Sequence, residues 1–572
     1  MLSDEVINKV VARLVERIQK GNEYVLKKIG ENVKKIGILS PSSRRELEQI
    51  MQYGGDYNKI VRELSKITKI NIKEIKEIFN EIAKDDYKFA KDFYNYRNVK
   101  YIPYDDNKAL RSLVDSVAKA TSGDYANIMN TKMIGFNVMD ANGNVVFKDL
   151  KQAYIDTMDE AVLNVGQGKE TFDEAMNRTL TQLGESGLQS VQYESGRTMR
   201  LDSAINMNLR GAIRDLHNQL QEQIGEEIDA DGMEISVHGN PAVDHADAQG
   251  HQFSIKKEKG EKYSEWEKLQ IYGHAKDYEG KEVDIRVTSK KGHTSWRPIS
   301  MYNCYHVGFS VVLGVNDPQY SQEELNEINR KNEEGFEFEG KHYTNYEGTQ
   351  LQRRIENEVR RMKDMQILGK AGGDNEMVAE AQTKITQLNK KYKNLSQASG
   401  LPTQMERMKV EGYKRTKIDI KNYNEIAYAR KNNKIWHSTG NAVDIIKDNK
   451  IEAPSIAVGK QISAKVRYGN QFIEFKPEIL ENVNKNTILY KGDGGNEFLR
   501  NENKFKNLMS MLKNNPKDYN EIKFNNDLEA LKYIKKIYIR EDEDKQVINF
   551  LKEKGIEYKF YKDFRTKLFK KN

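Results

Sequence analysis

Cysteine is almost absent from this chain, which contains one such residue among 572. A single cysteine excludes a framework of disulfides within the chain. Proline is also scarce, with 9 residues. No run of about 20 apolar residues is present, so we expect no membrane span. Hydrophobic residues make up 37% of the chain and charged residues 31%, a composition typical of long, solvent-exposed helices. The length predicts several domains rather than one core.

The net charge of +7 is distributed unevenly along the chain. Residues 431–572 carry 29 lysines and arginines and 20 aspartates and glutamates, a net charge of +9, whereas the first 430 residues sum to −2. A basic terminal segment on a near-neutral body indicates a separate module, and such a charge favours contact with nucleic acid. Enrichment of lysine on an ordinary protein surface is the alternative interpretation.

Hydrophobic periodicity predicts a multidomain protein with a mainly α-helical body, a small α+β insertion that contains histidine and cysteine, and a C-terminal α+β domain. Apolar residues repeat at helical spacing in the body, give way to short strands and turns near Met233, and return to helical spacing near Ser321. The predicted divisions are a helical region 1–230, an α+β segment 231–320, a helical hairpin 321–410, a linker 411–433 and a C-terminal domain 434–572.

Three local predictions concern the body. The first helix is expected to begin at an N-cap, Ser3, and to end at Gly21. The sequence DANGNVVF (140–147) predicts the tip of a β-hairpin. The sequence TQLQRRIENEVRRMKDMQILGK (349–370) predicts a long helix that forms a hairpin with the next helix, and its apolar seam is Leu351, Ile355, Val359, Met362 and Met365.

Histidine is scarce too, with 9 residues, yet it gathers near the single cysteine in two short segments. His238 and His245 lie in HGNPAVDHADAQGHQFS (238–254), and Cys304 and His306 lie in YNCYHVGFSVVLG (302–314). One thiolate and three imidazoles can form a tetrahedral zinc site, which would fix the long excursion between the segments to its base. We therefore expect these four residues to bind zinc. A buried thiol beside unrelated histidines is the alternative.

Four motifs, in order, resemble a family of phage minor capsid (head morphogenesis) proteins of tailed phages and prophages of Gram-positive bacteria. They are YESGRTMRLDSAINMNLRGA (193–212), SVHGNPAVDHADAQGHQFS (236–254), YNCYHVGFSVVLGVNDPQYSQEEL (302–325) and YTNYEGTQLQRRIENEVRRMKDM (343–365). The resemblance covers roughly residues 190–410. It implies a virion protein of the capsid interior or portal vicinity, with the portal and other head proteins as partners and with contact to phage DNA during ejection.

Two departures from that family's pattern affect one role of the insertion. The arginine usual in the first histidine motif is replaced within GNPAVDH, and Tyr305 stands where the family has an arginine between cysteine and histidine. These changes put an anion-binding role in doubt and leave the four candidate metal ligands in place.

The C-terminal domain opens with KIWHSTGNAVDIIKDNKIEAPSIAVGK (434–460), which predicts a strand ending in His437, Ser438 and Thr439 and then a short helix. This order resembles the start of ADP-ribosyltransferases of the diphtheria-toxin-like and DNA-targeting kinds. The resemblance implies that His437 bonds the nicotinamide ribose of NAD and that the residues just after it read the nicotinamide amide. The final strands resemble the same group, which gives Glu521 the place of the catalytic glutamate. Further candidates are Tyr468 and Tyr490 for stacking on nicotinamide, and Lys460, Lys465 and Arg467 for the phosphates.

The chemistry of NAD cleavage fits these residue types. Breaking the glycosidic bond passes through an oxocarbenium-like cation, which one carboxylate near the ribose can stabilise. The resemblance thus implies an effector that is delivered into the bacterial cytoplasm and modifies a cellular target. It is incomplete, since Asn449 and Lys450 stand where Gly-Leu is usual and no Glu-x-Glu pair is present.

Two other functions of the C-terminal domain stay open. A small nuclease would use His437 as a general base, with lysine or arginine on the scissile phosphate. A non-enzymatic structural domain would decorate the head or dock to the portal. A transferase requires a concave site that joins His437 to Glu521, a nuclease requires His437 among basic residues, and a structural domain requires neither.

Overall fold

The computed structural model divides the chain into two compact units, Met1–Thr416 and Lys417–Asn572, and both contain helices and strands. The described residues are 4–38, 54–88, 90–129, 134–140, 142–153, 155–156, 180–191, 198–288, 292–300, 304, 306–452, 454–462, 471–492, 505, 507–514, 519–540 and 545–561. None of the described helices is long and apolar enough to cross a membrane.

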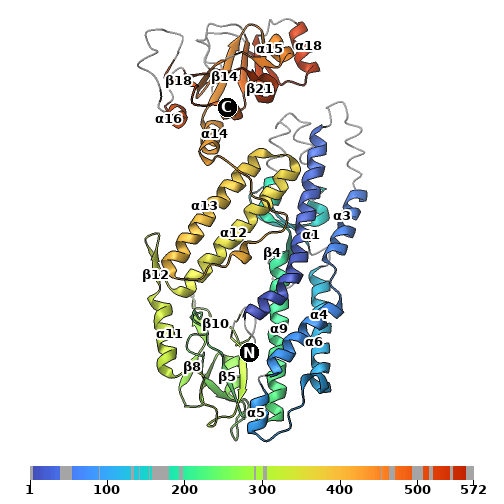
Figure 1. Cartoon of the computed structure of the whole chain (residues 1–572), viewed down its shortest axis with the longest axis vertical. Helices are drawn as coiled ribbons and strands as arrows, with labels where there is room; N and C mark the ends of the chain where they lie inside the picture. Colours follow the sequence, from blue (N-terminus) through green and yellow to red (C-terminus); the bar gives the residue numbers. More distant parts are fainter. Residues whose placement is uncertain are drawn as a thin grey trace. The chain divides into compact units, whose positions relative to one another are not determined.

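Long helices form the larger part of the first unit (Figure 1). Apolar side chains at helical spacing along each helix are buried in one extended core, which is the usual reason for amphipathic helices to pack together. The N-terminal helices are α1 (Asp4–Ile38), α3 (Gly54–Thr68), α4 (Ile72–Lys88), α5 (Lys91–Tyr96), α6 (Lys108–Ile128) and α9 (Leu201–Glu227). The unit is therefore a helical body, as the hydrophobic periodicity predicts.

The first helix corrects one prediction. Helix α1 continues through Gly21 to Ile38, and its predicted N-cap, Ser3, lies outside the described residues. A Cβ atom at position 21 would come within 2.7 Å of the Thr68 side chain and 2.8 Å of Leu64 in α3. Gly21 therefore allows α1 and α3 to approach each other closely and does not end the helix. The apolar residues Leu14 and Ile18 of this helix are buried.

A small sheet in the body contains the predicted hairpin. Strands β1 (Ile134–Met139) and β2 (Val145–Asp149) are antiparallel, with Met139 opposite Val145. Gly143 has a φ of 82°, which glycine adopts without strain, and the turn closes with hydrogen bonds to Asp140. The sheet order is β2-β1-β3-β4, with β3 (Gln189–Val191) and β4 (Thr198–Arg200). The hairpin prediction is confirmed.

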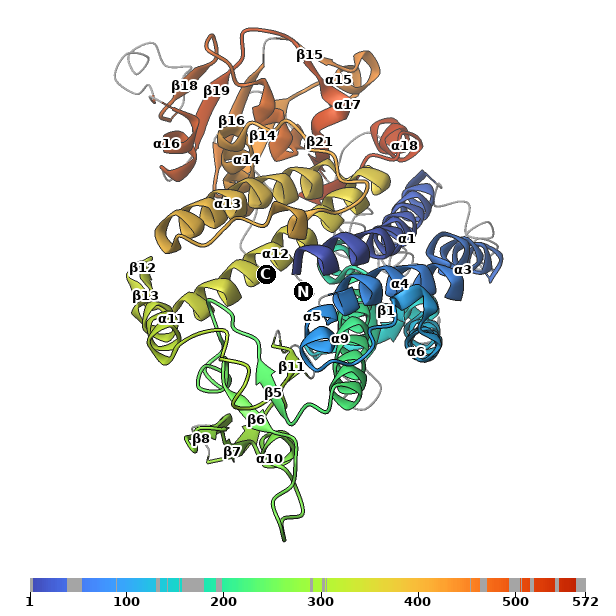
Figure 2. The same ribbon diagram turned by 60° about the horizontal axis from the view of Figure 1, so that its bottom comes forward.

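A three-stranded sheet follows α9 and supports the histidine and cysteine segments. Its order is β11-β5-β6, with β5 (Gly232–Ile235), β6 (Gln252–Ser254) and β11 (Gly308–Val311), all antiparallel. Figure 2 shows these strands with α10 (Glu265–Tyr272), β7 (His274–Lys276) and β8 (Glu282–Asp284) beyond them. A hairpin of β9 (Arg286–Thr288) and β10 (Thr294–Trp296) completes the segment, which we call the insertion (residues 231–320).

A helical hairpin closes the first unit, as predicted. Helix α11 (Gln322–Glu334) and the strands β12 (Phe336–Phe338) and β13 (Lys341–Tyr343) lead into α12 (Asn345–Gly372), and α13 (Asn375–Ser399) runs back beside it (Figure 1). In the predicted seam, Ile355, Val359, Met362 and Met365 are buried and Leu351 is half-buried. Helix α12 also packs along α1, so the hairpin is part of the helical body.

A buried network of charged groups, which we call the ionic network (Arg200, Asp202, Arg360 and Asp364), joins three parts of this body. Arg200 at the end of β4 pairs with Asp202 in the first turn of α9, with 3.2 Å between Nε and Oδ1, and also with Asp364 of α12. Arg360 Nη1 of α12 lies 3.0 Å from Asp202 Oδ2. Helix α1 contributes neutral donors, because Gln19 donates to Asp202 and Asn22 donates to Asp364.

The second unit is built on a seven-stranded sheet of order β18-β19-β16-β14-β17-β21-β22, in which only β21 and β22 are parallel. Its strands are β14 (Lys434–Thr439), β16 (Ser455–Gly459), β17 (Gln471–Phe475), β18 (Ile488–Tyr490), β19 (Asn520–Lys523), β21 (Ile534–Arg540) and β22 (Tyr558–Tyr561). Helices and two short strands surround it, namely α14 (Ile420–Asn432), α15 (Ala442–Asp448), α16 (Leu508–Lys513), α17 (Ala530–Tyr533), α18 (Lys545–Glu553), β15 (Lys450–Ile451) and β20 (Leu528–Glu529). Helix α14 falls within the predicted linker 411–433, yet it packs against α16 in the second unit.

Alternate residues of these strands pack into two separate apolar clusters, as the two-residue period of a strand requires. Ile435, Ile456, Ile473, Ile522 and Ile537 belong to the larger cluster, which also includes residues of α14 to α18. Trp436, Ala457, Phe472, Tyr519 and Tyr538 belong to the second cluster, which is rich in aromatic rings. The sheet therefore has an aliphatic face and an aromatic face.

The ionic network predicts a large loss of stability when one of its carboxylates is removed. Burial alone would raise the pKa of Asp202, but Arg200 and Arg360 outweigh burial and hold this pKa well below its usual range. We expect Asp202→Ala to lower the free energy of unfolding by about 3–5 kcal/mol, because two guanidinium groups lose a buried partner. Urea titration of the full chain followed by circular dichroism measures this change.

The exposed Glu327, which pairs with Arg330 and Lys331 on α11, supplies the matched control. Glu327→Ala is expected to leave the urea midpoint unchanged within error, because exposed ion pairs contribute little to stability. Since the Asp202 pKa is depressed in the folded state, the network's contribution is present above the unfolded pKa, near pH 4, and is lost only as the pH falls further. Equal losses in the two variants at pH 7 would contradict this account.

Candidate metal centre and C-terminal sites

The strands of the insertion bring the predicted metal ligands to one end of its sheet. His238 lies three residues after β5, and His306 lies two residues before β11. Because β5 and β11 are antiparallel neighbours, with Gly308 opposite Ile235, these two positions meet. Rings of His238 and His306 are in edge contact, with 4.8 Å between their centroids. Cys304 is buried, and the neighbouring Tyr305 lies outside the described residues.

Three of the predicted ligands form a compact buried cluster, which we call the Cys/His centre (His245, Cys304 and His306). Cys304 Sγ lies 3.3 Å from His245 Nδ1 and 3.7 Å from His306 Nδ1. The candidate ligand atoms of the three residues lie within 4.8 Å of one another, and all three side chains are buried. His238 is half-buried and borders the cluster through its contact with His306. The structure thus brings together all four predicted residues.

Each histidine of the centre uses its second ring nitrogen for a hydrogen bond on the side away from the thiol. His245 Nε2 lies 2.8 Å from the Arg297 carbonyl oxygen, which can only accept, so this nitrogen carries the proton. His306 Nε2 lies 3.3 Å from Gln249 Oε1. Both contacts leave the lone pair on Nδ1, the nitrogen that faces Cys304.

The electrostatics of the centre favour neutral imidazole rings. Burial lowers the pKa of His245. Burial also lowers the pKa of His306 well below its usual value, and the neighbouring His238 and His245 act in the same direction. Burial raises the pKa of the Cys304 thiol, and backbone hydrogen bonds from Ser300 and His306 partly oppose this effect. Neutral imidazole is the form that binds metal ions.

Three residues that support the centre, Gln249, Asp244 and Arg297, were not predicted from the sequence. Gln249 accepts a hydrogen bond from the His238 backbone N–H at 2.9 Å, besides its contact with His306. The Arg297 guanidinium forms a two-point ion pair with Asp244, with nitrogen–oxygen distances of 2.7 and 2.8 Å. Gln249 and Asp244 lie within the quoted histidine motif, so the motif contained them, but their roles depend on contacts with distant residues.

In the second unit, His437 lies on β14 as predicted and lines a cavity of about 360 Å³. Its Nδ1 lies 2.9 Å from the Ser455 carbonyl oxygen, and burial lowers the pKa of the ring. Three of the charged residues around this cavity are acidic, Asp444, Asp448 and Glu452, and one is basic, Lys450. An acidic surrounding disfavours the phosphates of NAD and of nucleic acids. The basic surface that the nuclease interpretation requires is thus not found around this cavity.

The strand register places His437 and Glu521 on opposite faces of the sheet. His437 pairs with Ile473 on the aliphatic face, whereas Glu521 pairs with Ala457 on the aromatic face. Ser455 contacts both residues, because its hydroxyl donates to Glu521 and its carbonyl oxygen accepts from His437. The cavity at His437 does not include Glu521. The cavity that His437 lines is therefore not a site that joins the two side chains.

The other predicted NAD-binding residues are distributed in the same way. Ser438 is adjacent to His437 and pairs with Phe472 on the aromatic face, and Thr439 lines the cavity with His437. Tyr490 is buried and lies opposite Glu521. Lys460 is exposed near the end of β16. Tyr468, Lys465 and Arg467 lie outside the described residues.

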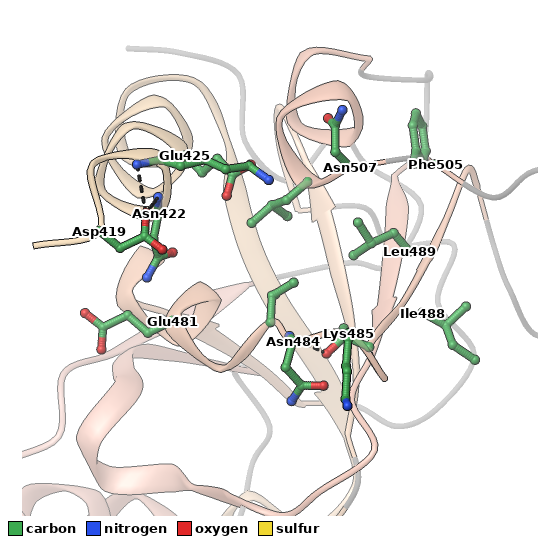
Figure 3. Close-up of a pocket in the computed structure, with 14 residues that line it drawn as sticks. Asp419, Asn422, Glu425, Glu481, Asn484, Lys485, Ile488, Leu489, Phe505 and Asn507 are labelled. Atoms are coloured by element: carbon green, nitrogen blue, oxygen red, sulfur yellow. Dashed lines mark hydrogen bonds between the residues drawn. The ribbon is translucent and has the colours of Figure 1, made fainter.

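A larger cavity of the second unit, about 650 Å³, was not predicted (Figure 3). Side chains from α14, from the segment 481–489 and from the start of α16 line it, among them Asp419, Glu425 and Lys485. Glu425 is buried, its Oε1 atom has no hydrogen-bond partner among the described residues, and burial raises its pKa. No sequence motif marks these residues, and the sequence predicts a linker where α14 lies.

Comparison with protein families matches residues 2–396 to the family described as Phage minor capsid protein 2. No curated protein and no solved structure matches the chain significantly. The matched residues extend from α1 into α13 and include the ionic network, the insertion and the Cys/His centre. They cover most of the chain and end before the second unit begins at Lys417. The chain belongs to the phage minor capsid protein 2 family.

Proposed function

We propose that this protein is a structural component of the phage head, in the capsid interior or near the portal, and that its first unit performs the assembly role. The observation that carries this proposal is the extent of the family match, which covers residues 2–396 and lies entirely within the first unit. That unit has its own extended apolar core and its own ionic network. The portal and other head proteins are the partners that this role requires.

The second unit is, on this proposal, an additional module carried by the capsid protein. It has a separate sheet, two apolar clusters of its own and a net basic sequence. Decoration of the head or docking to the portal requires no catalytic cleft, which agrees with the separation of His437 and Glu521 on two faces. A non-enzymatic role is therefore the function of this unit that the geometry supports best.

An effector that transfers ADP-ribose from NAD to a cellular target is the second candidate for this unit. Two observations favour it: β14 ends at His437–Thr439 and leads into α15 in the order that the resemblance implies, and Ser455 contacts both His437 and Glu521. The opposite orientation of the two side chains and the acidic cavity at His437 count against it.

Truncation after Thr416 tests the structural role. We expect a chain ending at residue 416 to enter phage heads at the level of the full chain, because the family match lies within the retained unit. Quantitative mass spectrometry of purified heads measures the incorporation. Met362→Asp places a charge in the fully buried seam of α12 and is the control that should abolish incorporation. A folded, expressed truncated chain that is missing from heads would contradict the proposal.

Labelled NAD, incubated with the full chain and a bacterial lysate, separates the two candidates for the second unit. The structural role predicts no label on any macromolecule beyond the background of lysate alone. The transferase predicts transfer that Glu521→Ala abolishes and that Glu529→Ala preserves, because Glu529 is an exposed carboxylate of the same unit. Transfer with this pattern would replace the structural role of the second unit by the enzymatic one.

A further inference from the structure

The Cys/His centre has the ligand types, the ligand spacing and the hydrogen bonds of a metal site. Unrelated buried side chains have no need to combine these three features. Two ligands of a tetrahedral zinc ion, a sulfur at about 2.3 Å and a nitrogen at about 2.0–2.1 Å, lie about 3.6 Å apart. The observed distances from Cys304 Sγ to His245 Nδ1 and His306 Nδ1 are 3.3 and 3.7 Å. Both sulfur–nitrogen distances therefore fit ligands of one zinc ion.

We propose that Cys304 Sγ, His245 Nδ1 and His306 Nδ1 bind one structural zinc ion, with the His238 ring as the fourth ligand. The His238 ring lies beside the other three residues, because it is in edge contact with the His306 ring. A thiolate with imidazole ligands suits zinc rather than calcium or magnesium, which prefer oxygen. The centre is buried, and structural zinc sites of this kind are closed by four protein ligands.

The hydrogen bonds behind the ligands support the same assignment. Metal-binding histidines almost always donate their other ring N–H to a carbonyl or carboxylate, which fixes the ring. His245 donates to the Arg297 carbonyl oxygen, and His306 donates to Gln249 Oε1. Both bonds orient Nδ1 toward Cys304. Gln249 also holds the His238 backbone N–H, so one amide positions two ligands.

The insertion has a physical need for such an ion. Its own cluster contains eight buried apolar side chains among the described residues: Ile235, Ala248, Phe253, Leu269, Ala275, Val283, Ile285 and Ile299. A core of this size gives little stability, and small domains often use a metal ion as an additional cross-link. The ion would tie the 238–249 turn to the segment that enters β11. Strand β11 is in turn fixed to α9, where the Ser310 hydroxyl donates to the Gln221 carbonyl oxygen at 2.6 Å.

Metal analysis of the full chain tests the assignment. Elemental analysis after purification without chelator is expected to give one zinc per chain, which Cys304→Ser loses and which His274→Ala retains. His274 is an exposed histidine of the same insertion and has no contact with the centre among the described residues. A folded protein that lacks zinc and whose unfolding temperature does not rise on addition of Zn²⁺ would overturn the proposal, as would equal zinc loss in the two variants.

Cobalt substitution keeps the test decisive if Cys304→Ser fails to fold. The Co²⁺-loaded full chain is expected to show the strong visible bands of tetrahedral cobalt and a thiolate-to-cobalt charge-transfer band. In His238→Gln, whose changed side chain is half-buried, the charge-transfer band should persist and the visible bands should change, because one nitrogen ligand is lost. Weak bands typical of octahedral cobalt, or spectra unaffected by His238→Gln, would contradict the four-ligand site.

Gln249 is a positioning residue, because it holds two of the proposed ligands. This role predicts an effect on zinc affinity, which an amide that only stabilises the fold would not have. We expect Gln249→Ala to weaken zinc affinity by about 10–100-fold, the usual effect of removing a partner of a ligating histidine. Gln249→Glu retains an acceptor for the His306 N–H and should restore the affinity to within a few-fold. Competition with a chromophoric chelator measures both constants. An unchanged affinity in Gln249→Ala would refute this part of the assignment.

Discussion

The helical body depends on a set of charged groups whose two carboxylates are buried and whose two guanidinium groups are largely buried. Arg200, Asp202, Arg360 and Asp364 come from β4, α9 and α12, and two side chains of α1 donate further hydrogen bonds to the carboxylates. Asp364 is completely buried and Asp202 almost so, hence each needs its partners in place. Removing one partner of a buried ion pair leaves an uncompensated buried charge, which is strongly destabilising. The network therefore links α1, α9 and the α12–α13 hairpin at one point, and the insertion is attached to the far part of α9 through β11.

The division of the chain into two units agrees with the extent of the family match. The family match ends at residue 396, within α13, and the contacts of the first unit end at Thr416. Residues beyond this point form a sheet with a different architecture and a basic composition. A capsid protein can carry such a module without disturbing its own core, because each unit buries its own apolar clusters. This organisation explains how one chain combines an assembly role with a second unit for which the family implies nothing.

Local patterns predicted the elements of the chain better than the relations between them. Helical periodicity found the seam of α12, and the DANG turn found the β1–β2 hairpin. The prediction that the first helix ends at Gly21 was wrong, because sequence alone does not distinguish a glycine that permits close packing from a glycine that ends a helix. Arg200 and Asp202 lie in a motif, but no local pattern predicts their role, since their partners Asp364 and Arg360 lie about 160 positions away. Spacing correctly grouped the four metal candidates, but it did not reveal Gln249 as their common support. His437 and Glu521 fell on the strands expected for them, and only the register placed them on opposite faces.

X-ray absorption at the zinc edge tests the central structural claim most directly, namely that the Cys/His centre is a metal centre. On the purified full chain we expect one sulfur at about 2.3 Å and three nitrogens at about 2.0–2.1 Å. A first shell of oxygen atoms, or a shell without sulfur, would show that the ion is bound elsewhere. The single cysteine makes this result decisive, because any zinc–sulfur distance of thiolate length must come from Cys304.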